Sequence, residues 1–266
     1  MDILEKIKAI KQDRFDLSDY LIHFTRNKDG KSSFETLKEI VNSGQIKCSW
    51  SVRNAKRTIF GSKSAVCFTD MPLYSFYRYV LNRNDITKVD FYGIAIHKTK
   101  MFRLGARNVI YGTTTENETE SKNPNNEEWT NPNLPTNEQY RYMLTDINDV
   151  NDWTHEREWR WANHFDKSKG DHLPIWQNNE YEEGLGDTEF YQERGIFIIV
   201  RFENEIDELE KIFLTFSDKK IYNKENIART WAVSLESLKA NSRLTYDKLD
   251  FISLIKDAIC RQMPSS

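Results

Sequence analysis

Hydrophobic and polar residues along this chain repeat with both the helical and the strand period, which predicts an α+β fold. Ser32 followed by Glu35 is a capping-box pattern, so we expect a helix that begins there and ends at Gly44. A second helix is expected after Asp70, with Asp70 as its N-cap and Pro72 in its first turn.

Short β-prone runs separated by polar turns predict the strands. These runs lie at residues 20–25, 46–50, 65–69, 91–96, 108–111, 155–161, 195–202 and 211–216. The run at 195–202 is the longest apolar one, so we expect it to be a central strand. Further helices are expected at about 2–12 and 137–147.

Polar segments at 51–63 and 112–136 are expected to be loops. The second is long enough to be a lid or a mobile segment. The tail from about 221 to 259 is expected to be mostly helical, because it has apolar residues spaced for one packed face: Leu249, Ile252, Ile255 and Ile259.

The chain has neither internal repeats nor a Gly/Ser-rich linker, so we expect a single domain over residues 1–266. Its motif-bearing core would span about 18–216, and a helical C-terminal extension about 217–266. The balance of 38 basic and 41 acidic residues gives a net charge of −3, which by itself attracts neither nucleic acid nor membrane.

Three cysteines, Cys48, Cys67 and Cys260, lie far apart and form no CxxC pattern. They indicate reduced thiols rather than a disulfide or zinc framework. The N-terminal residues lack the apolar core of a secretion signal, and no segment approaches 18 consecutive apolar residues. A cytoplasmic protein that does not associate with a membrane is therefore expected.

The segment 155–161 carries the most informative chemistry of the chain. In a strand, alternate residues share a face, so Glu156, Glu158 and Arg160 would line one face and the two tryptophans of the segment the other. Two carboxylates that meet in a cleft are typical of a catalytic site. The alternative is a half-exposed strand whose charges are solvated.

A second element, His23 with Thr25, lies on the predicted strand at 20–25. Histidine and threonine can bond ribose hydroxyls and a carboxamide, tyrosine rings can stack on a nicotinamide, and a glutamate can stabilise an oxocarbenium-like transition state. Together these groups fit a cationic dinucleotide with a glycosidic bond. Alternatively, His23 is a core strand histidine, Thr25 only packs, and the tyrosines near residue 76 are core residues.

Several runs of the sequence resemble, in the same order, motifs of the ADP-ribosyltransferase fold and of abortive-infection proteins of the AbiGi type. They are Leu21-Ile22-His23-Phe24-Thr25, Leu37-Lys38-Glu39-Ile40 with Gly44, Val66-Cys67-Phe68-Thr69-Asp70-Met71-Pro72-Leu73, Phe91-Tyr92-Gly93-Ile94-Ala95 and Glu156-Arg157-Glu158-Trp159-Arg160. The resemblance covers about residues 20–161. It implies a split β-sheet core flanked by helices.

The resemblance also implies roles for individual residues. Glu158 matches the catalytic glutamate and Glu156 would assist it, while Arg53 or Arg57 lies where DNA-modifying relatives place a catalytic arginine. NAD+ would be held by residues on the first strand and by two tyrosines of the following helix: His23, Phe24, Thr25, Tyr74 and Tyr79. NAD+ is the expected substrate, and no metal is expected.

The expected function is therefore a mono-ADP-ribosyltransferase toxin of bacterial anti-phage defence, with a cognate antitoxin as partner. An alternative is a catalytically inactive antitoxin or partner-binding protein with the same fold. Another is a nuclease-like effector with a metal on Glu156 and Glu158, which would need a third acid such as Asp152.

A stretch with basic residues and no acid predicts the acceptor. It contains Lys47, Arg53, Lys56, Arg57 and Lys63, with Trp50 and Phe60 interleaved. Cations that neutralise phosphate beside rings that stack on unpaired bases are typical of single-strand binding, so we expect a nucleic-acid acceptor, RNA before DNA or protein. Alternatively, this stretch contacts only the pyrophosphate of NAD+.

Overall fold

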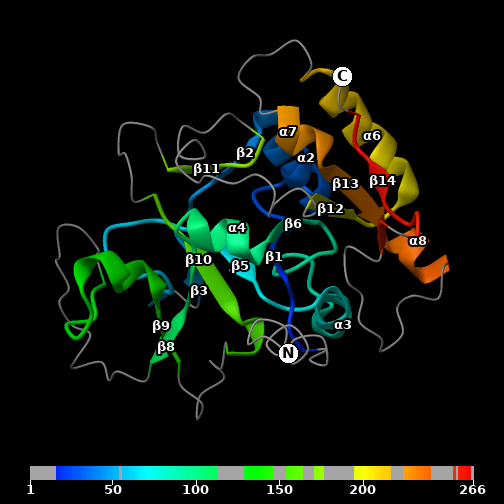
Figure 1. Cartoon of the computed structure of the whole chain (residues 1–266). Coiled ribbons are helices and arrows are strands. Elements are labelled where there is room, and N and C mark those ends of the chain that lie inside the picture. Colours follow the sequence, from blue (N-terminus) through cyan, green and yellow to red (C-terminus); the bar gives the residue numbers. More distant parts are fainter. Residues whose placement is uncertain are drawn as a thin grey trace, which may run out of the picture.

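The computed structural model describes residues 16–53, 56–112, 129–145, 154–163, 171–176, 195–216, 224–240, 254–255 and 257–264. The helix expected at 2–12 and most of the loop expected at 112–136 lie outside these residues. Figure 1 shows the arrangement of the described elements, a mixed α/β fold built around a large sheet.

The main sheet has eight strands in the order β14-β13-β12-β6-β1-β5-β10-β7. These strands are β1 (Tyr20–Phe24), β5 (Val66–Thr69), β6 (Gly93–His97), β7 (Arg107–Asn108), β10 (Glu158–Trp161), β12 (Ile196–Val200), β13 (Thr230–Ser234) and β14 (Arg261–Gln262). All neighbours pair antiparallel except β12 and β13, which are parallel. The expected central strand at 195–202 is confirmed as β12, which has neighbours on both sides.

The other described strands form three two-stranded sheets. They are β2 (Gln45–Lys47) with β11 (His172–Pro174), β3 (Val52–Arg53) with β4 (Lys56–Arg57), and β8 (Ile110–Gly112) with β9 (Tyr142–Leu144). The helices are α2 (Ser33–Ser43), α3 (Leu73–Arg83), α4 (Lys98–Arg103), α6 (Glu203–Leu214), α7 (Lys224–Ala228) and α8 (Leu235–Ala240), with 3-10 helices η1 (Thr136–Arg141) and η2 (Thr154–Glu156).

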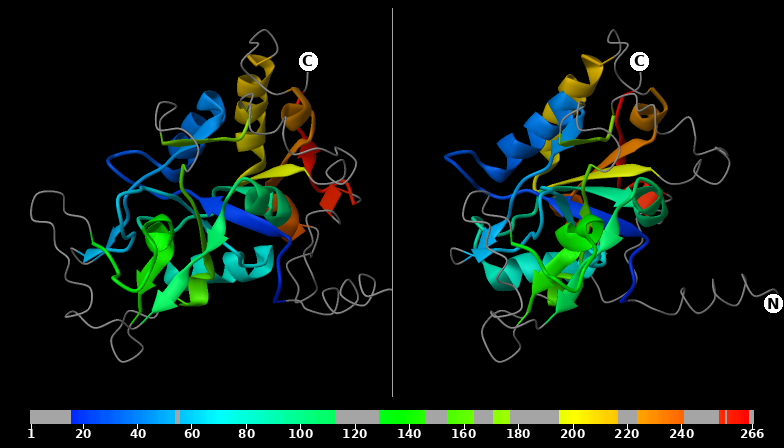
Figure 2. Two further views of the ribbon diagram at one scale, coloured as in Figure 1. Left: turned by 60° about the vertical axis from the view of Figure 1, so that its left-hand side comes forward. Right: turned by 90° about the vertical axis from the view of Figure 1, so that its left-hand side faces the viewer.

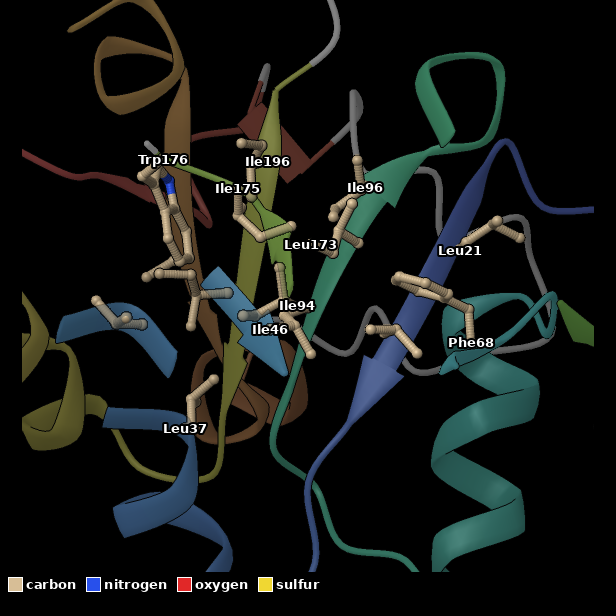
Figure 3. Close-up of a cluster of buried hydrophobic side chains, with 14 of the residues drawn as sticks. Leu21, Leu37, Ile46, Phe68, Ile94, Ile96, Leu173, Ile175, Trp176 and Ile196 are labelled. Carbon is tan, nitrogen blue, oxygen red and sulfur yellow. The ribbon is translucent and has the colours of Figure 1, made fainter. Parts of the chain in front are cut away.

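Helices cover both faces of the main sheet. Successive residues of β12 point to opposite faces, so Ile198 joins a cluster with Leu37 of α2 and Leu209 of α6, while Phe197 joins another with Phe76 of α3. Both views of Figure 2 place α2 and α6 on one side of the sheet and α3 on the other. Figure 3 shows the first cluster, in which Leu37 and Trp176 pack beside the strands.

The capping box predicted for α2 is confirmed. The Ser32 hydroxyl accepts a hydrogen bond from the backbone N–H of Glu35, and the Glu35 carboxylate accepts one from the backbone N–H of Ser32. Gly44 ends the helix with φ 71°, a left-handed conformation that glycine adopts at little cost.

Three local predictions were wrong. Residues 211–216 form the end of α6 and the turn after it, because Ile206, Leu209 and Phe213 repeat with the helical period and are buried together. Asp70 does not cap α3, which begins at Leu73 without a side-chain cap. The helix expected at 137–147 is the short η1 followed by β9.

The polar stretch at 51–63 and the run at 108–111 each differ from the prediction. The first contains the two paired strands β3 and β4. The second is divided, because β7 joins the main sheet while β8 pairs with β9.

The tail was predicted to be mostly helical, and this is only partly correct. Besides α7 and α8 it supplies β13 and β14 to the main sheet, where Val233 and Ala232 are fully buried. Ile255 and Ile259 pack against the second core cluster as expected, but residues 257–260 are not helical. Leu249 and Ile252 lie outside the described residues.

Candidate functional site

The Glu-x-Glu segment is not one continuous strand. Glu156 is the last residue of η2, and β10 begins at Glu158. Arg157 between them has φ 47°, a left-handed conformation that is strained for a residue with a Cβ. The expectation that Glu156, Glu158 and Arg160 line one strand face is therefore wrong for Glu156 and correct for the other two.

Glu158 lies in a row of residues that crosses three strands distant in sequence. Ile22 of β1 is paired with Thr69 of β5, and Thr69 is paired with Glu158 of β10. The Ile22–Thr69 pair is the single register pair between β1 and β5, whereas β1 and β6 share five. Thr69 thus places Glu158 next to the junction of β1 and β5.

A fully buried guanidinium holds Glu158. Nε of Arg160 donates to Oε1 of Glu158 at 2.8 Å and Nη2 donates to Oε2 at 3.4 Å. Nη1 of the same side chain donates to the carbonyls of Tyr140 (2.8 Å) and Tyr142 (3.0 Å). Arg160 therefore ties Glu158 to the segment of η1 and β9.

Burial is the largest influence on the pKa of Arg160 and would lower it, but the charge and hydrogen bond of Glu158, together with Cys67 and Tyr111, outweigh burial, so the pKa of the guanidinium is raised. The carboxylate side chain of Glu158 is only 8% exposed. The pair is thus a desolvated ion pair, in which either charge depends on the other.

Helix α3 binds the side chain of Glu156, and strand β5 binds its backbone. The Tyr79 hydroxyl donates to Oε1 of Glu156 at 2.8 Å, and Nη1 of Arg83 donates to the Tyr79 oxygen at 3.0 Å. The backbone carbonyl of Glu156 accepts a hydrogen bond from the Thr69 hydroxyl at 2.7 Å. Glu156 is buried, like Glu158.

Tyr111 of β8 is hydrogen-bonded to the backbone of Glu158, and no sequence pattern singled it out. Its oxygen accepts a hydrogen bond from the backbone N–H of Glu158 at 2.9 Å. Burial raises the pKa of Tyr111 to about 12, and the charges of Glu158 and Glu156 contribute to that rise. Tyr111 is therefore a neutral phenol at physiological pH. The missed signal was its aromatic side chain in a β-prone run.

His23, which was expected to hold NAD+, lies on the face of the sheet opposite Glu158. Nδ1 of His23 lies 2.9 Å from the carbonyl of Cys67, and its ring packs on Phe68 at 5.8 Å between centroids. Strand pairing puts His23 and Phe68 on the face opposite Glu158, because Ile22 shares a row with Glu158. Burial lowers the pKa of His23, although the Cys67 hydrogen bond opposes this change. The lowered pKa keeps the imidazole neutral.

Thr25 and Phe24 are engaged within the fold. The Thr25 hydroxyl donates to the carbonyl of Ser33 at 2.8 Å and is buried. The Phe24 ring stacks on Phe76 of α3 at 5.9 Å between centroids. Of the two tyrosines predicted to stack on nicotinamide, Tyr79 reaches Glu156, whereas Tyr74 is half-buried in the first turn of α3.

The basic stretch contains a short antiparallel arm. Its backbone pairs Val52 with Arg57 and Arg53 with Lys56, and a bridge between Ser49 and Ala65 closes its base. The side chains of residues 52–57 are outside the described part of the chain. The expected catalytic role of Arg53 therefore stays a prediction. At the ends of the stretch, Lys47 is exposed and Lys63 half-buried.

Within the described ranges, no three His, Cys, Asp or Glu side chains are grouped so that they could hold a metal ion. Asp152, the third acid that a nuclease site would need, lies outside those ranges. None of the helices described above combines the length and apolar composition needed to cross a bilayer.

Comparison with known proteins gave no match to a family model, to a curated protein or to a solved structure. The expected ADP-ribosyltransferase chemistry therefore rests on the sequence motifs quoted above and on the arrangement of Glu156 and Glu158.

Proposed function

We propose that this chain is an NAD+-dependent mono-ADP-ribosyltransferase of bacterial anti-phage defence, with Glu156 and Glu158 as its catalytic carboxylates. The observation that carries the proposal is the burial of these two carboxylates two residues apart, one at the end of a 3-10 turn and the other at the start of the strand that pairs with β5. Each carboxylate is fixed in place by a hydrogen-bond donor, which is the preorganisation that electrostatic catalysis needs.

The charge of this cluster suits a cationic transition state. When ionised, Glu156 and Glu158 each carry a negative charge; Arg160 is bonded directly to Glu158, whereas Arg83 reaches Glu156 only through the Tyr79 hydroxyl. When the glycosidic bond of NAD+ breaks, its electron pair leaves with nicotinamide and the ribose becomes cationic at C1′. A fixed negative charge in a desolvated site stabilises that cation, and Glu158 accepts the proton of the nucleophile that forms the new bond to C1′.

The acceptor in this proposal is nucleic acid, and RNA before DNA or protein. The β3–β4 arm pairs Arg53 with Lys56 in register, so two cationic residues lie directly opposite each other. Like charges at paired positions destabilise a two-stranded arm, and phosphate groups would relieve this repulsion. Exposed Trp50, close to the base of the arm, offers a ring on which an unpaired base could stack.

A second candidate is a protein of the same defence class that binds a partner and has no catalytic activity, such as an antitoxin. Three observations also fit this second candidate. Arg160 neutralises Glu158 from within the core, the Thr25 hydroxyl is committed to Ser33, and His23 lies on the other face of the sheet. Buried carboxylates would then serve the fold alone.

Nicotinamide release from NAD+ separates these candidates. The purified protein is incubated with NAD+, with and without EDTA, beside Glu158→Gln and a control, Glu39→Gln, which removes an equal charge from an exposed ion pair with Lys31. A transferase releases nicotinamide whether or not EDTA is present, and at equal concentrations of folded protein Glu158→Gln lowers the rate by at least about a hundredfold while Glu39→Gln does not. No release by the wild-type protein would rule the transferase out. Cleavage of nucleic acid that EDTA abolishes would identify a metal nuclease.

The toxin role has its own test. Expression of the chain alone in bacteria is expected to stop growth, and Glu158→Ala is expected to restore it at an equal level of folded protein. Normal growth with the wild-type chain would favour the partner-binding candidate.

A further inference from the structure

Helix α3 reaches Glu156 through two side chains one turn apart. Tyr79 donates its hydroxyl hydrogen to Oε1 of Glu156 at 2.8 Å, and Arg83 donates to the Tyr79 oxygen at 3.0 Å. Residues four apart lie on the same face of a helix, so one face of α3 presents both groups. Arg83, Tyr79 and Glu156 therefore form a continuous chain of donors and acceptors, here called the α3 relay.

The helix that carries the α3 relay is firmly packed. Phe76 and Val80, on either side of Tyr79 along the helix, are buried in the core cluster on this face of the sheet. Such packing fixes the backbone at Tyr79, so the hydroxyl can move only by rotation of the Tyr79 side chain. The positive charge of Arg83 on its oxygen also polarises the phenol and makes it a stronger donor to a carboxylate.

The ring of Tyr79 has cationic and aromatic neighbours. The Arg83 guanidinium carbon lies 5.8 Å from its centroid, and the His155 ring lies 5.6 Å away at a tilt of 55°. The nicotinamide of NAD+ is itself cationic, so it would compete with Arg83 for the same π electrons and be repelled by its charge. This environment does not suit the stacking role that sequence resemblance gives to Tyr79.

We infer that Tyr79, held by Arg83, is a positioning residue that fixes the Glu156 carboxylate, and is not a platform for nicotinamide. The inference rests on the transferase proposed above. It assigns a role to Arg83, which the sequence motifs did not single out, and it moves Tyr79 from substrate binding to the support of a catalytic carboxylate.

Tyr79→Phe separates the two roles because it keeps the ring and removes the hydroxyl. A positioning role predicts that kcat for NAD+ consumption falls by about tenfold while KM changes less than about twofold. Arg83→Gln is expected to lower kcat by a smaller factor, since it acts through Tyr79. Tyr77→Phe is the matched control on the same helix, because the contacts of Tyr77 are with the Phe91 ring and with Lys239. Unchanged kcat in Tyr79→Phe, or a loss confined to KM in Tyr79→Ala, would overturn the inference.

A thermal unfolding cycle tests the α3 relay independently of any activity. Tyr79→Phe, Glu156→Ala, which removes the acceptor, and the double variant are compared with the wild-type protein. If the hydroxyl fixes the carboxylate, each single change lowers Tm by about 2–4 °C, and the double change lowers it by clearly less than the sum. Additive shifts in Tm would overturn the inference even if the protein is active. A wild-type protein that consumes no NAD+ would remove the transferase, and a non-additive cycle would still establish that Tyr79 holds Glu156.

Discussion

The two carboxylates of the candidate site are two residues apart in sequence, yet the fold holds them in different ways. Glu158 is paired with a guanidinium that has no exposure at all, and that guanidinium also binds two backbone carbonyls. Glu156 accepts a hydrogen bond from the phenol of a half-buried tyrosine on a helix. The first arrangement ties a charge to the stability of the core, whereas the second leaves a carboxylate whose loss the fold can tolerate.

The largest expected effect is the difference in stability between the two substitutions to glutamine. Glu158→Gln leaves the Arg160 charge buried without its counterion, so the free energy of unfolding should fall by about 3–5 kcal/mol. Glu156→Gln keeps an acceptor for Tyr79 and should cost about 1 kcal/mol. Urea denaturation measures both values. Equal losses would mean that the two carboxylates are held equally strongly.

The next effect concerns a group on the opposite face of the sheet. Burial lowers the pKa of His23 below its ordinary value of 6.5, so the unfolded chain binds a proton more readily than the folded one. His23 should therefore reduce stability as the pH falls below the unfolded value, by up to about 1.4 kcal/mol per pH unit.

His23→Asn removes this dependence, because the asparagine amide can donate to the Cys67 carbonyl without titrating. Denaturation between pH 7 and pH 5 should show a shallower slope for this variant. Calorimetry with NAD+ on the same variant tests the predicted role of His23 in NAD+ binding. An affinity equal to that of the wild type would leave His23 with a packing role alone.

The backbone between the two carboxylates provides a smaller effect. Arg157 adopts φ 47°, and its side chain contacts Asp70 at 3.9 Å. Replacement by glycine removes both this contact and the backbone strain. Arg157→Ala loses the contact but keeps the strain, so we expect Arg157→Gly to be more stable than Arg157→Ala by about 1 kcal/mol. If Arg157→Ala is the more stable variant, residue 157 is not held in a strained left-handed conformation, and that conformation does not separate Glu156 from β10.

The smallest effect is expected at the β3–β4 arm. Lys56→Glu should reduce labelling of RNA by labelled NAD+ by roughly severalfold, and the dependence of labelling on salt should become shallower. Lys88→Glu, an exposed charge reversal outside the basic stretch, is the control. RNA, single-stranded DNA and a protein extract are offered separately. Label found on protein alone would contradict a nucleic-acid acceptor.

Local sequence signals predicted the fold where short-range chemistry decides it. Helix α2 was predictable because its cap, its first turn and its final glycine are all encoded within thirteen residues, Ser32 to Gly44. Residues 211–216 were not, because a short apolar run fits a strand as well as the end of a helix, and packing of Phe213 against the sheet decides between them. The same ambiguity hid β13, whose strand character depends on pairing with β12.

The candidate site was predictable only in part. The pairing of Glu158 with Arg160 follows from the strand period, since alternate residues share a face. The left-handed turn at Arg157 could not be predicted, because nothing in the residue type favours it. The contribution of Tyr111 and Tyr79 depends on contacts across 47 and 77 residues of sequence, which no local pattern encodes.

The position of β6 in the sheet has a consequence for synthesis of the chain. Strands β1, β5, β6, β7 and β10 are all complete by Trp161, and they can pair as soon as they leave the ribosome. The outer edge of β6 is then covered only when β12 appears, about a hundred residues after β6 itself. All five residues of β6 are buried in the finished fold, so a nascent chain carries an open, apolar strand edge during this interval. A truncated product that ends before Ile196 would keep that edge permanently and should aggregate, even though it contains both carboxylates.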